Sequence, residues 1–453
     1  MAVNPEQHLA CFKAYDIRGK VPDELDIDRV TKIARAYAQW LKPSRVVVGY
    51  DIRLSSPEIA DAVARGLNDE GVDVVELGLC GTEHVYFATF HHELDGGIMV
   101  TASHNPAEYN GLKPVRELAR PLSSVSGLGE IEQEVIADSF GPAPGGGGRE
   151  PLNVMQDYIQ HLLTYIDVAA LPPMKIVTNP GNGGAGRVID ALDPHLPFTF
   201  ERVHHEPDGK FPNGVPNPLL PDNRQVTRDA VLQSGATMGV AWDGDFDRCF
   251  LFDETGGFIE GYYIVGLLAE SILSRNPGGK IVHDPRLTWN TLETVEAAGG
   301  IAVQSKSGHA FVKDVMRRED AVYGGEMSAH HFFREFSYCD SGMVPWMLVA
   351  ALVASRGKPL SALVSDRMER FPASGEINRR VDDADVVIER IKDEYGPDAL
   401  KIDETDGVGI DFESWRFNLR KSNTEPLIRL NVETRGDRAL MEARTEELLS
   451  RIV

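Results

Sequence analysis

The fold class is decided by residues 45–77, which read RVVVGYDIRLSSPEIADAVARGLNDEGVDVVEL. Residues 45–50 form a largely apolar run, which is typical of a parallel strand that is covered on both faces. Residues 56–68 place apolar residues at helical spacing after a Ser-Pro start. Residues 72–77 and 96–100 again have the pattern of strands. This order predicts a βαβ series and an α/β fold.

The same alternation recurs along the chain. Further strands are predicted at residues 175–178, 238–242, 249–252, 280–283 and 428–432, and further helices at residues 186–192, 262–273, 288–298, 343–355 and 439–451. Residues 141–150 (GPAPGGGGRE) interrupt the pattern, and four consecutive glycines favour a flexible boundary. At roughly 150 residues per domain, the chain length predicts about three domains, with two to four plausible. We predict three α/β domains with mixed sheets and a smaller α+β domain, at residues 1–150, 151–255, 256–368 and 369–453.

Composition and charge exclude several classes of protein. Hydrophobic residues make up 42% of the chain, which is enough for packed cores and excludes wholesale disorder. The 69 acidic residues outnumber the 46 basic ones and give a net charge of −23. Such a chain repels nucleic acid and anionic lipid at long range, so we expect neither as a partner. An anionic ligand would have to be held by a local cluster of Arg and Lys.

The cysteines and the apolar runs predict a cytoplasmic location. The four cysteines are scattered and form no C-x-x-C pair, which favours a reducing compartment. The first residues, MAVNPEQHLACFK, lack the pattern of a signal peptide. The longest apolar run, residues 343–354, is broken by Pro345 and is shorter than the roughly 20 residues that a membrane span needs. We therefore expect a soluble protein.

The first motif with chemical character is TASHNP, residues 101–106, directly after the predicted strand at residues 96–100. A polar turn at the C-terminal end of a strand is where α/β folds place their active sites. Ser103 is a candidate nucleophile there, and His104 and Lys113 could transfer protons. An ordinary turn closed by Asn-Pro explains the same residues equally well. A serine hydrolase is less favoured because the G-x-S-x-G elbow is absent.

The second motif is DGDFDR, in which Asp243, Asp245 and Asp247 alternate along the chain. Three close carboxylates suit a hard cation such as Mg²⁺. Arg248 beside them favours a site for metal and phosphate together, because a guanidinium can bind phosphate oxygens bidentately. A calcium EF-hand is disfavoured, since Arg248 stands where that loop needs glycine. A solvated acidic turn remains the alternative.

The third motif is YGGEMSAHH, residues 323–331. Its glycines allow close backbone approach, and Glu326 and Ser328 could bind sugar hydroxyls. The adjacent histidines, His330 and His331, invite a metal site, but neighbours in a strand point to opposite faces and are poor joint ligands. A purely structural turn is an equal alternative.

The fourth motif is RKSNTEP, residues 420–426, which is followed by Ile428 and Arg429. Cations, hydroxyls and turn N–H groups together predict a phosphate-binding loop. In so acidic a chain, we expect this cluster to bind a small anion, and a solvated basic turn is the alternative. A further pattern, Gly181, Gly183 and Gly186, matches the G-x-G-x-x-G of dinucleotide-binding folds, with Glu201 at about the expected distance. It lies in the middle of the chain, so it only weakly favours nicotinamide binding.

Taken together, the motifs resemble those of the α-D-phosphohexomutase family. The resemblance begins at FKAYDIRG, residues 12–19, and extends to the phosphate loop, so it covers essentially the whole chain. Residues 305–313 (SKSGHAFVK) and 324–333 (GGEMSAHHFF) are similar to bacterial phosphomannomutases within the family. Phosphoglucomutases more often carry Glu-Glu-Ser where this chain has Glu-Met-Ser with Met327.

The resemblance implies a fold and a set of site residues. It implies four domains around a central active-site cleft, each contributing one loop. It implies Mg²⁺ as cofactor, held by Ser103, Asp243, Asp245 and Asp247. The implied catalytic residues are Ser103 as phosphoserine, His104, Lys113, His309 and Arg18. The implied substrate-binding residues are Tyr15, Arg18, Arg248, Arg286, Gly308, His309, Glu326, Ser328, Arg420, Ser422, Asn423, Thr424 and Arg429.

The resemblance also implies an activity. Mannose 6-phosphate and mannose 1-phosphate would be interconverted through phosphoserine 103 and a hexose 1,6-bisphosphate, which also serves as activator. This would supply GDP-mannose and polysaccharide synthesis. A phosphoglucomutase or an enzyme with both specificities is the alternative. The partners would be hexose phosphates, and the enzyme would be a monomer or a homodimer.

Two positions depart from the family pattern, and rival functions remain open. Arg286 stands where some relatives have a contacting Lys, and Cys80-Gly81-Thr82-Glu83 replaces a turn that often contains proline, so the contacts of both are open. A metal-dependent phosphatase would use similar residues but would need water as acceptor. A nicotinamide oxidoreductase would rest on the glycine pattern. A sugar-phosphate sensor would keep the Arg420 loop and leave Ser103 unphosphorylated.

Overall fold

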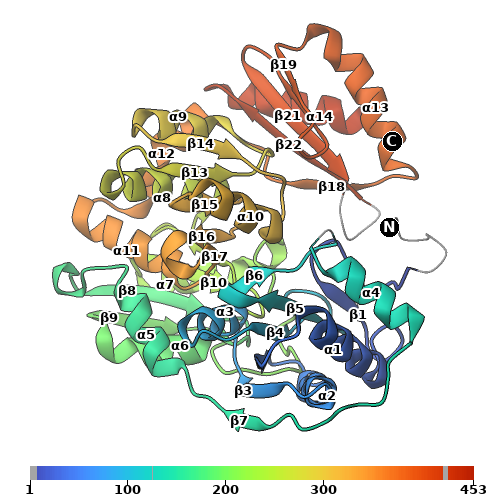
Figure 1. Cartoon of the computed structure of the whole chain (residues 1–453). Coiled ribbons are helices and arrows are strands. Elements are labelled where there is room, and N and C mark those ends of the chain that lie inside the picture. The colour runs from blue at the N-terminus through green and yellow to red at the C-terminus, as the bar shows by residue number, and fades with distance from the viewer. Residues whose placement is uncertain (1–7, 125, 422–426, 453) are drawn as a thin grey trace. The chain divides into compact units, whose positions relative to one another are not determined.

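The computed structural model describes residues 8–124, 126–421 and 427–452 (Figure 1). The chain divides into two compact units. Unit 1 consists of Met1–Phe258 and Cys339–Ser355, and unit 2 consists of Ile259–Tyr338 and Arg356–Val453.

Unit 1 begins with a mixed seven-stranded sheet. Its order is β1-β5-β4-β2-β3-β7, and β6 pairs with β5. The strands are β1 (Ile17–Lys20), β2 (Arg45–Tyr50), β3 (Asp73–Leu79), β4 (Gly96–Val100), β5 (Tyr109–Arg116), β6 (Arg120–Pro121) and β7 (Arg149–Pro151). Strand β2 runs parallel to β3 and β4, whereas β5 is antiparallel to β1 and β4. The βαβ series predicted from residues 45–77 is confirmed.

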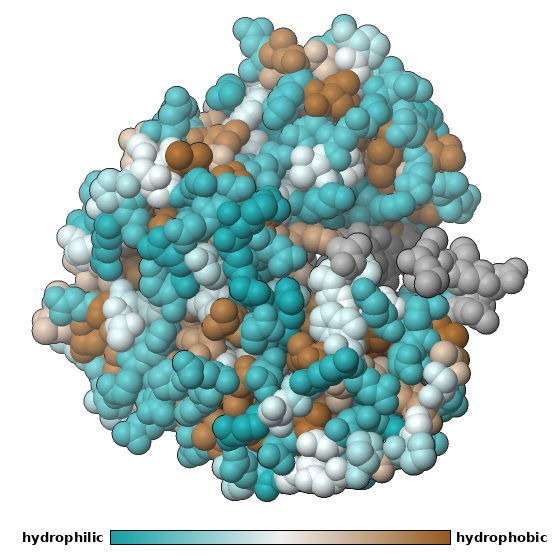
Figure 2. Space-filling model, in the orientation of Figure 1, coloured by the Kyte–Doolittle hydropathy of each residue, from teal (hydrophilic) through white to brown (hydrophobic). Residues whose placement is uncertain are grey.

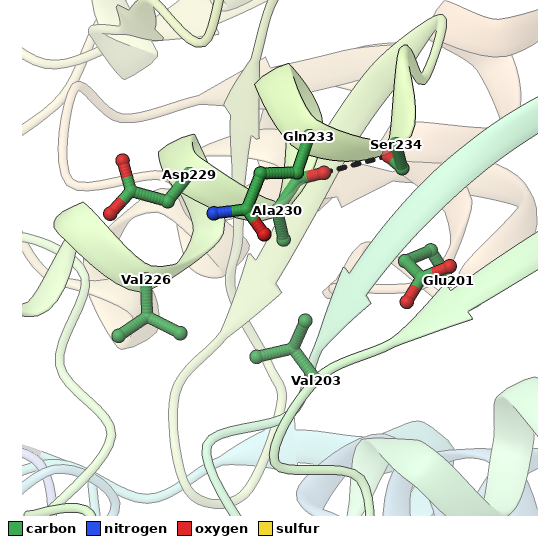
Figure 3. Close-up of a pocket in the computed structure, with 7 residues that line it drawn as sticks. All are labelled: Glu201, Val203, Val226, Asp229, Ala230, Gln233 and Ser234. Atoms are coloured by element: carbon green, nitrogen blue, oxygen red, sulfur yellow. Dashed lines mark hydrogen bonds between the residues drawn. The ribbon is translucent and has the colours of Figure 1, made fainter.

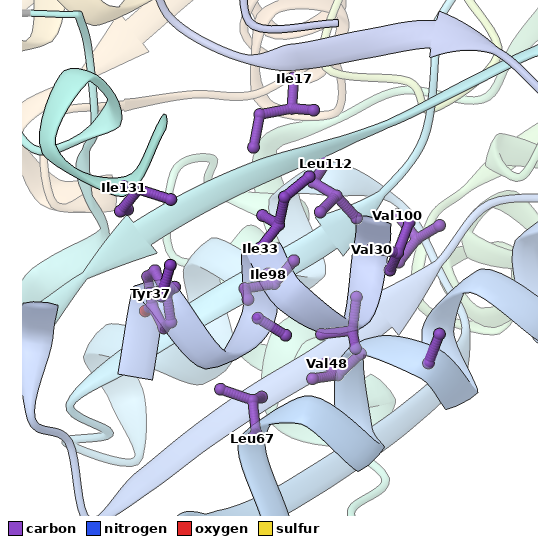
Figure 4. Packing of buried hydrophobic residues seen from close by; sticks show 14 of the residues in the cluster. Ile17, Val30, Ile33, Tyr37, Val48, Leu67, Ile98, Val100, Leu112 and Ile131 are labelled. Atoms are coloured by element: carbon purple, nitrogen blue, oxygen red, sulfur yellow. The ribbon is translucent and has the colours of Figure 1, made fainter. Parts of the chain in front are cut away.

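Helices cover both faces of this sheet. They are α1 (Ile27–Leu41), α2 (Ser56–Asp69), α3 (Thr82–His91) and α4 (Leu128–Ala137). One core joins α1, α2 and α4 to the sheet, with Ile33, Leu67, Ile98 and Ile131 among its buried members (Figure 4). Side chains alternate along a strand, so Gly97 faces the other side. There a Cβ on Gly97 would lie 2.7 Å from Thr89 Oγ1 of α3, whereas one on Gly96 would lie 2.0 Å from the Tyr37 hydroxyl of α1, which explains the two glycines that open β4.

The predicted linker, residues 141–150, runs into the last strand of this sheet. Residues 149–151 form β7, which pairs in parallel with β3, so the boundary drawn at residue 150 falls inside a strand. Residues 141–148 form neither helix nor strand.

A second sheet in unit 1 follows the same plan. Its order is β12-β11-β10-β8-β9. The strands are β8 (Met174–Asn179), β9 (Phe198–Arg202), β10 (Met238–Trp242), β11 (Cys249–Phe252) and β12 (Phe258–Ile259), and the helices are α5 (Met155–Leu163), α6 (Ala185–Leu192), α7 (Gln225–Ser234) and α11 (Val344–Arg356). Strand β10 is parallel to β8 and antiparallel to β11. A short strand, β17 (Cys339–Asp340), precedes α11. The tight turn between β10 and β11 carries the acidic motif.

Unit 2 contains a third α/β sheet and an antiparallel one. The strands of the third sheet that belong to unit 2 run in the order β14-β13-β15-β16, with β13 parallel to β14 and β15. The strands are β13 (Lys280–His283), β14 (Ile301–Gln304), β15 (Tyr323–Gly325) and β16 (His331–Phe333), and the helices are α8 (Gly261–Arg275), α9 (Trp289–Ala297), α10 (His309–Glu319) and α12 (Leu360–Arg370).

The C-terminal sheet has the order β18-β22-β21-β20-β19. Its strands are β18 (Ile377–Arg380), β19 (Lys401–Asp403), β20 (Val408–Asp411), β21 (Trp415–Lys421) and β22 (Leu427–Thr434), and its helices are α13 (Ala384–Tyr395) and α14 (Arg438–Arg451). All of its strand pairs are antiparallel. The fold class of three mixed-sheet α/β domains and a smaller α+β domain is therefore confirmed.

No single helix in the described part of the chain is long and apolar enough to cross a membrane, and α11 and α12 meet the requirement only as a bent pair.

Candidate active site

Ser103 lies in a turn at the C-terminal end of β4, with a backbone φ of 49°. This left-handed conformation is uncommon for a residue other than glycine and persists only where the surroundings enforce it. The side chain of Thr101 accepts a hydrogen bond from the N–H of Ser103 at 2.8 Å. The buried guanidinium of Arg53 donates to the carbonyl oxygens of Ser103 at 2.9 Å and Asn105 at 2.6 Å. These contacts hold the serine hydroxyl in one place.

Arg53 was missed by the sequence analysis. It is 1% exposed and also donates to the carbonyl oxygens of Pro106 and Tyr109. The available signal was its position just after β2, which is the neighbour of β4 in the parallel part of the sheet. Charged residues at the carboxyl ends of adjacent strands converge.

The acidic turn lies against this serine within unit 1. The Ser103 hydroxyl donates to Asp243 Oδ2 at 2.8 Å. Arg248 donates to the same carboxylate through Nε at 2.9 Å, and its terminal nitrogen lies 3.3 Å from Ser103 Oγ. One oxygen each from Asp243, Asp245 and Asp247 lies within 4.8 Å of the others, and all three side chains are buried. The arrangement places a hydroxyl, a guanidinium and three carboxylates around one point.

The charges of this cluster fit a divalent cation. Burial raises the pKa of Asp243 to about 6; Arg248 opposes the rise, and Asp247 and Asp245 add to it. Asp245 Oδ1 is buried and has no hydrogen-bond partner among the described residues. Three carboxylates face two cations, Arg248 and Lys113, so negative charge remains in excess. Oxygen donors with excess negative charge are what Mg²⁺ prefers.

Lys113, in β5, bridges two of these carboxylates. Its Nζ donates to Asp245 at 2.7 Å and to Asp247 at 2.6 Å. Burial alone would lower the pKa of Lys113, but Asp245 and Asp247 outweigh it and raise the pKa above its usual value. In this arrangement Lys113 is an ammonium, which can donate a proton and cannot accept one.

His104 has the opposite character. Its Nδ1 lies 2.9 Å from Ser103 Oγ and 2.5 Å from the terminal nitrogen of Arg248. Burial, reinforced by Arg248 and Arg18, lowers its pKa well below the usual value, so the imidazole is neutral. Arg18 donates to Asn105 Oδ1 at 2.7 Å and to Asp16 at 2.6 Å, which ties β1 to the serine turn. Tyr15 precedes β1 and is half-buried.

The turn at residues 80–83, whose contacts the sequence left open, packs beneath the acidic turn. Thr82 donates its hydroxyl to Asp245 Oδ2, and its N–H bonds the Asp245 carbonyl at 3.2 Å. A Cβ on Gly81 would lie 2.1 Å from the ring of Phe246. Glu83 is fully buried and accepts a hydrogen bond from Ser341. Burial raises the pKa of Glu83 to about 8.

The glycine pattern after β8 serves the same packing. A Cβ on Gly183 would lie 2.9 Å from the carbonyl oxygen of Gly244 in the acidic turn. A Cβ on Gly181 would lie 2.5 Å from Pro216, and one on Gly186 would lie 2.4 Å from the carbonyl oxygen of His205. Close packing within unit 1 therefore accounts for the three glycines without a dinucleotide.

In unit 2, the predicted sugar-binding residues gather at the carboxyl ends of β13 and β15. Arg286 forms a bidentate pair with Asp284, with both distances 2.9 Å. Its terminal nitrogen also lies 3.2 Å from Ser328 Oγ and 3.4 Å from Glu326 Oε1. The N–H of Gly308, which precedes α10, donates to Glu326 at 2.7 Å. Arg286, Gly308, Glu326 and Ser328 are thus brought together, and Asp284 was missed.

The three histidines of this region differ in role. His330 lies 3.2 Å from Glu326 Oε2, whereas the buried His331 lies 2.6 Å from the Tyr323 hydroxyl. The two neighbours face different partners, as expected from their adjacency. Although burial would raise it, His330 and Arg286 hold the pKa of Glu326 below its usual value. His309 opens α10 and its ring centroid lies 6.1 Å from that of His330.

The phosphate loop is described only at its flanks. Ser422, Asn423 and Thr424 lie outside the described residues. Arg420 and Arg429 are directly opposite each other on β21 and β22, so they share a face of the sheet.

One carboxylate pairs with three arginines here. Glu376 lies 3.1 Å from Arg420, 3.0 Å from Arg429 and 3.3 Å from Arg286. Burial would raise the pKa of Glu376, but the three arginines hold it below its usual value. Sequence reasoning missed Glu376, because no local motif marks it. Arg420 Nε is buried without a hydrogen-bond partner among the described residues, so this guanidinium keeps a donor that can bind phosphate.

A surface pocket elsewhere in unit 1 contains none of the predicted site residues. It has a volume of about 480 Å³ and lies between α7 and the end of β9 (Figure 3). Its lining residues are Glu201, Val203, Val226, Asp229, Ala230, Gln233 and Ser234. Its polar lining includes two carboxylates and no cation, which does not suit an anionic ligand.

Hydrophilic residues predominate on the face of the molecule shown in Figure 2.

Comparisons with known proteins cover the whole chain. Models of the phosphoglucomutase/phosphomannomutase family match its α/β/α domains I, II and III at residues 10–140, 156–257 and 260–371, and its C-terminal domain at residues 376–450. The chain is 59% identical over 440 residues to proteins named phosphohexose mutases from Xanthomonas campestris, covering 97% of this chain and 98% of the relative. It is 57% identical over 449 residues to a phosphomannomutase from Escherichia coli, covering 98% of each chain. A crystal structure of a phosphoglucomutase/phosphomannomutase family protein from Burkholderia thailandensis superposes with a TM-score of 0.88 at 30% identity, over 98% of this chain and 97% of the other.

Proposed function

Because the chain belongs to the phosphoglucomutase/phosphomannomutase family, we propose that it is a phosphomannomutase, which interconverts mannose 6-phosphate and mannose 1-phosphate. The observation that carries this proposal is the contact of Ser103 Oγ with both Asp243 and Arg248. A serine enclosed by a cation-binding carboxylate set and a guanidinium is suited to carry a phosphoryl group.

The proposed reaction has two transfers through Ser103. The bond between phosphorus and Ser103 Oγ breaks as a bond forms to the free hydroxyl of the mannose phosphate, which gives mannose 1,6-bisphosphate. The hydroxyl proton leaves with a base. The bisphosphate then turns over, its other phosphoryl group returns to Ser103, and the second monophosphate is released. Water must be kept out, because hydrolysis of the phosphoserine would end the cycle.

The residues around Ser103 have distinct parts in these transfers. Arg248 offers charged hydrogen bonds to the phosphoryl oxygens. When the serine hydroxyl is rephosphorylated it must lose its proton, and the neutral His104 and Asp243 are the two acceptors in contact with it. Lys113 and His309 remain the proposed groups for proton exchange with the sugar hydroxyls, and Lys113 starts as a donor because of its raised pKa.

We propose Mg²⁺ as the cation held by Asp243, Asp245, Asp247 and Ser103. When bound, it supplies charge neutralisation next to the transferred phosphoryl group. The excess of carboxylates over cations and the unpartnered Asp245 Oδ1 support this assignment.

The unit 2 residues are assigned to the part of the sugar phosphate that does not react. Glu326 and Ser328 would bind sugar hydroxyls, with Arg286 and Gly308 holding them in place. Arg420 and Arg429, with Ser422, Asn423 and Thr424, would bind the second phosphate. Tyr15 and Arg18 would contact the substrate from unit 1. We propose that a hexose 1,6-bisphosphate acts as activator.

The sugar preference is the finer part of the proposal. Met327 is buried, its N–H donates to Asp284 at 2.9 Å, and its sulfur lies 3.3 Å from Asn431 Nδ2. Its effect on sugar choice would therefore act through the position of the loop. A phosphoglucomutase or an enzyme with both specificities is the second candidate. We further propose a cytoplasmic monomer or homodimer that supplies GDP-mannose and polysaccharide synthesis.

The test compares kcat/KM for mannose 1-phosphate and glucose 1-phosphate, with Mg²⁺ and a trace of the matching bisphosphate. The proposal predicts conversion of mannose 1-phosphate to mannose 6-phosphate and the reverse, with a higher kcat/KM for the mannose phosphate than for the glucose phosphate. Preference for glucose would favour the second candidate, and release of inorganic phosphate in place of an isomer would show a phosphatase.

A further inference from the structure

A second group of candidate metal ligands lies in unit 1, on helices outside the site described above. His91 is the last residue of α3 and His92 caps that helix, with its N–H bonded to the Ala88 carbonyl at 3.1 Å. Asp157 lies in the first turn of α5. None of the three belongs to the serine turn, the acidic turn or the loops of unit 2.

Aromatic packing brings the two helices together. The ring of Phe87, one turn before His91, stacks on it with centroids 4.6 Å apart and an angle of 18° between the planes. Phe87 also contacts Tyr158, the neighbour of Asp157, at 5.5 Å. The end of α3 and the start of α5 are therefore held against each other by buried rings, which fixes the backbone that carries the polar side chains.

The polar atoms of this group converge without satisfying one another. One donor atom of each of His91, His92 and Asp157 lies within 4.8 Å of the others. Across the described residues, none of the three side chains forms a hydrogen bond or an ion pair, and His92 Nε2 is buried without a partner. A buried polar atom that stays unpartnered costs free energy, so a ligand that bonds it is favoured.

The donor types identify the class of ligand. Two imidazole nitrogens and a carboxylate oxygen suit borderline divalent ions such as Zn²⁺ and Ni²⁺, whereas the all-oxygen set of the acidic turn suits Mg²⁺. The last carbonyl groups of α3 carry partial negative charge, which favours a cation beside His91 and His92. His161 stands one turn after Asp157 on α5, and its ring contacts the same Phe87 at 5.5 Å, so a further imidazole is close by.

We propose that His91, His92 and Asp157 form a second cation site, specific for a late first-row transition ion of the Zn²⁺ class. Bound there, the ion joins the end of α3 to the start of α5 and stabilises unit 1. His91 is exposed, so the ion enters from solvent and keeps a coordination position for water. The site has no part in phosphoryl transfer.

The test is Zn²⁺ binding to the full chain, stripped of metal and measured by calorimetry in excess Mg²⁺, which occupies the acidic turn. The variants are His92→Ala and Asp157→Ala. The matched control is His195→Ala, an exposed histidine of the same unit. The proposal predicts one Zn²⁺ bound by wild type and by the control, and binding weakened at least about tenfold in both variants. Equal Zn²⁺ binding by all four proteins, or no binding by wild type, would overturn the proposal.

Two further readouts separate loss of a ligand from loss of the fold. Co²⁺ bound through imidazole absorbs visible light, whereas the all-oxygen site of the acidic turn binds Co²⁺ too weakly to contribute. This absorption should vanish in the two variants and persist in the control. Zn²⁺ should also raise the Tm of wild type and the control, but not that of the variants. Mutase turnover in Mg²⁺ should be the same in all four proteins. A variant that keeps both turnover and the Co²⁺ spectrum would contradict the assignment of its residue.

Discussion

At the scale of single residues, the geometry of Ser103 depends on side chains that come from other strands. The serine adopts a left-handed φ of 49°, and Arg53 binds four carbonyl oxygens of the segment around it. A lysine in this place would offer one ammonium where the guanidinium fork offers several fixed donors. Arg53 is therefore a positioning residue for the serine turn.

Replacement of Arg53 by Ala should lower the stability of the protein and displace Ser103. It removes one partner of a buried charge, Asp51, and leaves four carbonyl oxygens unbound, so we expect a loss of about 3–5 kcal/mol in the free energy of unfolding. Turnover should fall more than the Kd for substrate rises, because Arg53 positions Ser103 and does not bind sugar. Urea unfolding and initial rates measure the two effects. The control is Arg65→Ala, which removes an exposed ion pair with Asp61 on α2. An Arg53→Ala enzyme with wild-type stability and turnover would contradict this role.

The acidic turn gives a prediction about metal. EDTA should abolish activity and Mg²⁺ should restore it. Asp245→Asn removes an anionic oxygen from the proposed ligand set, so its Mg²⁺ activation curve should shift to concentrations at least about tenfold higher. The control is Asp229→Asn, a half-buried carboxylate of α7 that lies outside the acidic turn. Full activity in metal-free buffer, or an unshifted curve in Asp245→Asn, would show that the carboxylates serve only as partners of Lys113 and Arg248.

At the scale of elements, the first residues of α3 pack against the acidic turn and the residues around it. Thr82 bonds Asp245, and the buried Glu83 accepts from Ser341. The pKa of Glu83 is raised to about 8 by burial, so the folded protein holds a proton that the unfolded chain releases near its ordinary value of 4.5. The stability that this proton contributes is complete below the unfolded pKa and is lost as pH rises through the folded pKa.

Glu83→Gln should remove this pH dependence. Glutamine has the shape of the protonated acid and does not ionise, so the free energy of unfolding of the variant, relative to wild type, should rise between about pH 5 and about pH 9. Urea unfolding at a series of pH values measures the difference, with the exposed Glu58→Gln on α2 as control. A constant difference across this range would mean that Glu83 is ionised throughout.

The elements also show how far sequence reasoning reaches. The strand and helix at residues 45–50 and 56–68 were predicted, because apolar runs and helical spacing report burial directly. The residues that follow strand ends, such as Asp243 and Glu326, were predicted as site residues from their local motifs. Arg53, Thr82 and Glu376 were not, because each acts across a distance in sequence that no local pattern records. The structure supplied those contacts.

At the scale of the whole molecule, the acidic chain gathers several arginines around one carboxylate, that of Glu376. Its net charge is −23, yet Arg286, Arg420 and Arg429 all reach the single carboxylate of Glu376. Asp284 and Glu326 also pair with Arg286, so the donors that can bind a phosphate are those of the C-terminal sheet, such as Arg420 Nε, which is buried without a hydrogen-bond partner among the described residues. The proposed reaction needs this grip in both orientations of the sugar, because opposite ends of the bisphosphate react in turn with Ser103.

Arg420→Ala should make the enzyme depend on added bisphosphate. The change removes charged hydrogen bonds worth roughly 1.5–3 kcal/mol each, so both monophosphates should bind less tightly and the intermediate should escape more often. Each escape leaves Ser103 without phosphate. A titration of mannose 1,6-bisphosphate against initial rate measures the dependence, with the exposed Lys401→Ala of the same sheet as control. If the variant depended on added bisphosphate as wild type does, and only one of the two monophosphates bound more weakly, Arg420 would not bind phosphate in both orientations of the sugar.

The most direct measurement follows the phosphate on Ser103 itself. The purified chain is incubated with mannose 1,6-bisphosphate and Mg²⁺, analysed by intact mass and peptide mapping, and then mixed with mannose 6-phosphate. We expect one phosphate, located on Ser103, which leaves during the chase as an equal amount of bisphosphate appears. In Ser103→Ala we expect neither this phosphate nor turnover. A phosphate that lies on another residue, one that stays through the chase, or a Ser103→Ala enzyme with more than roughly a tenth of wild-type turnover would contradict the proposed reaction.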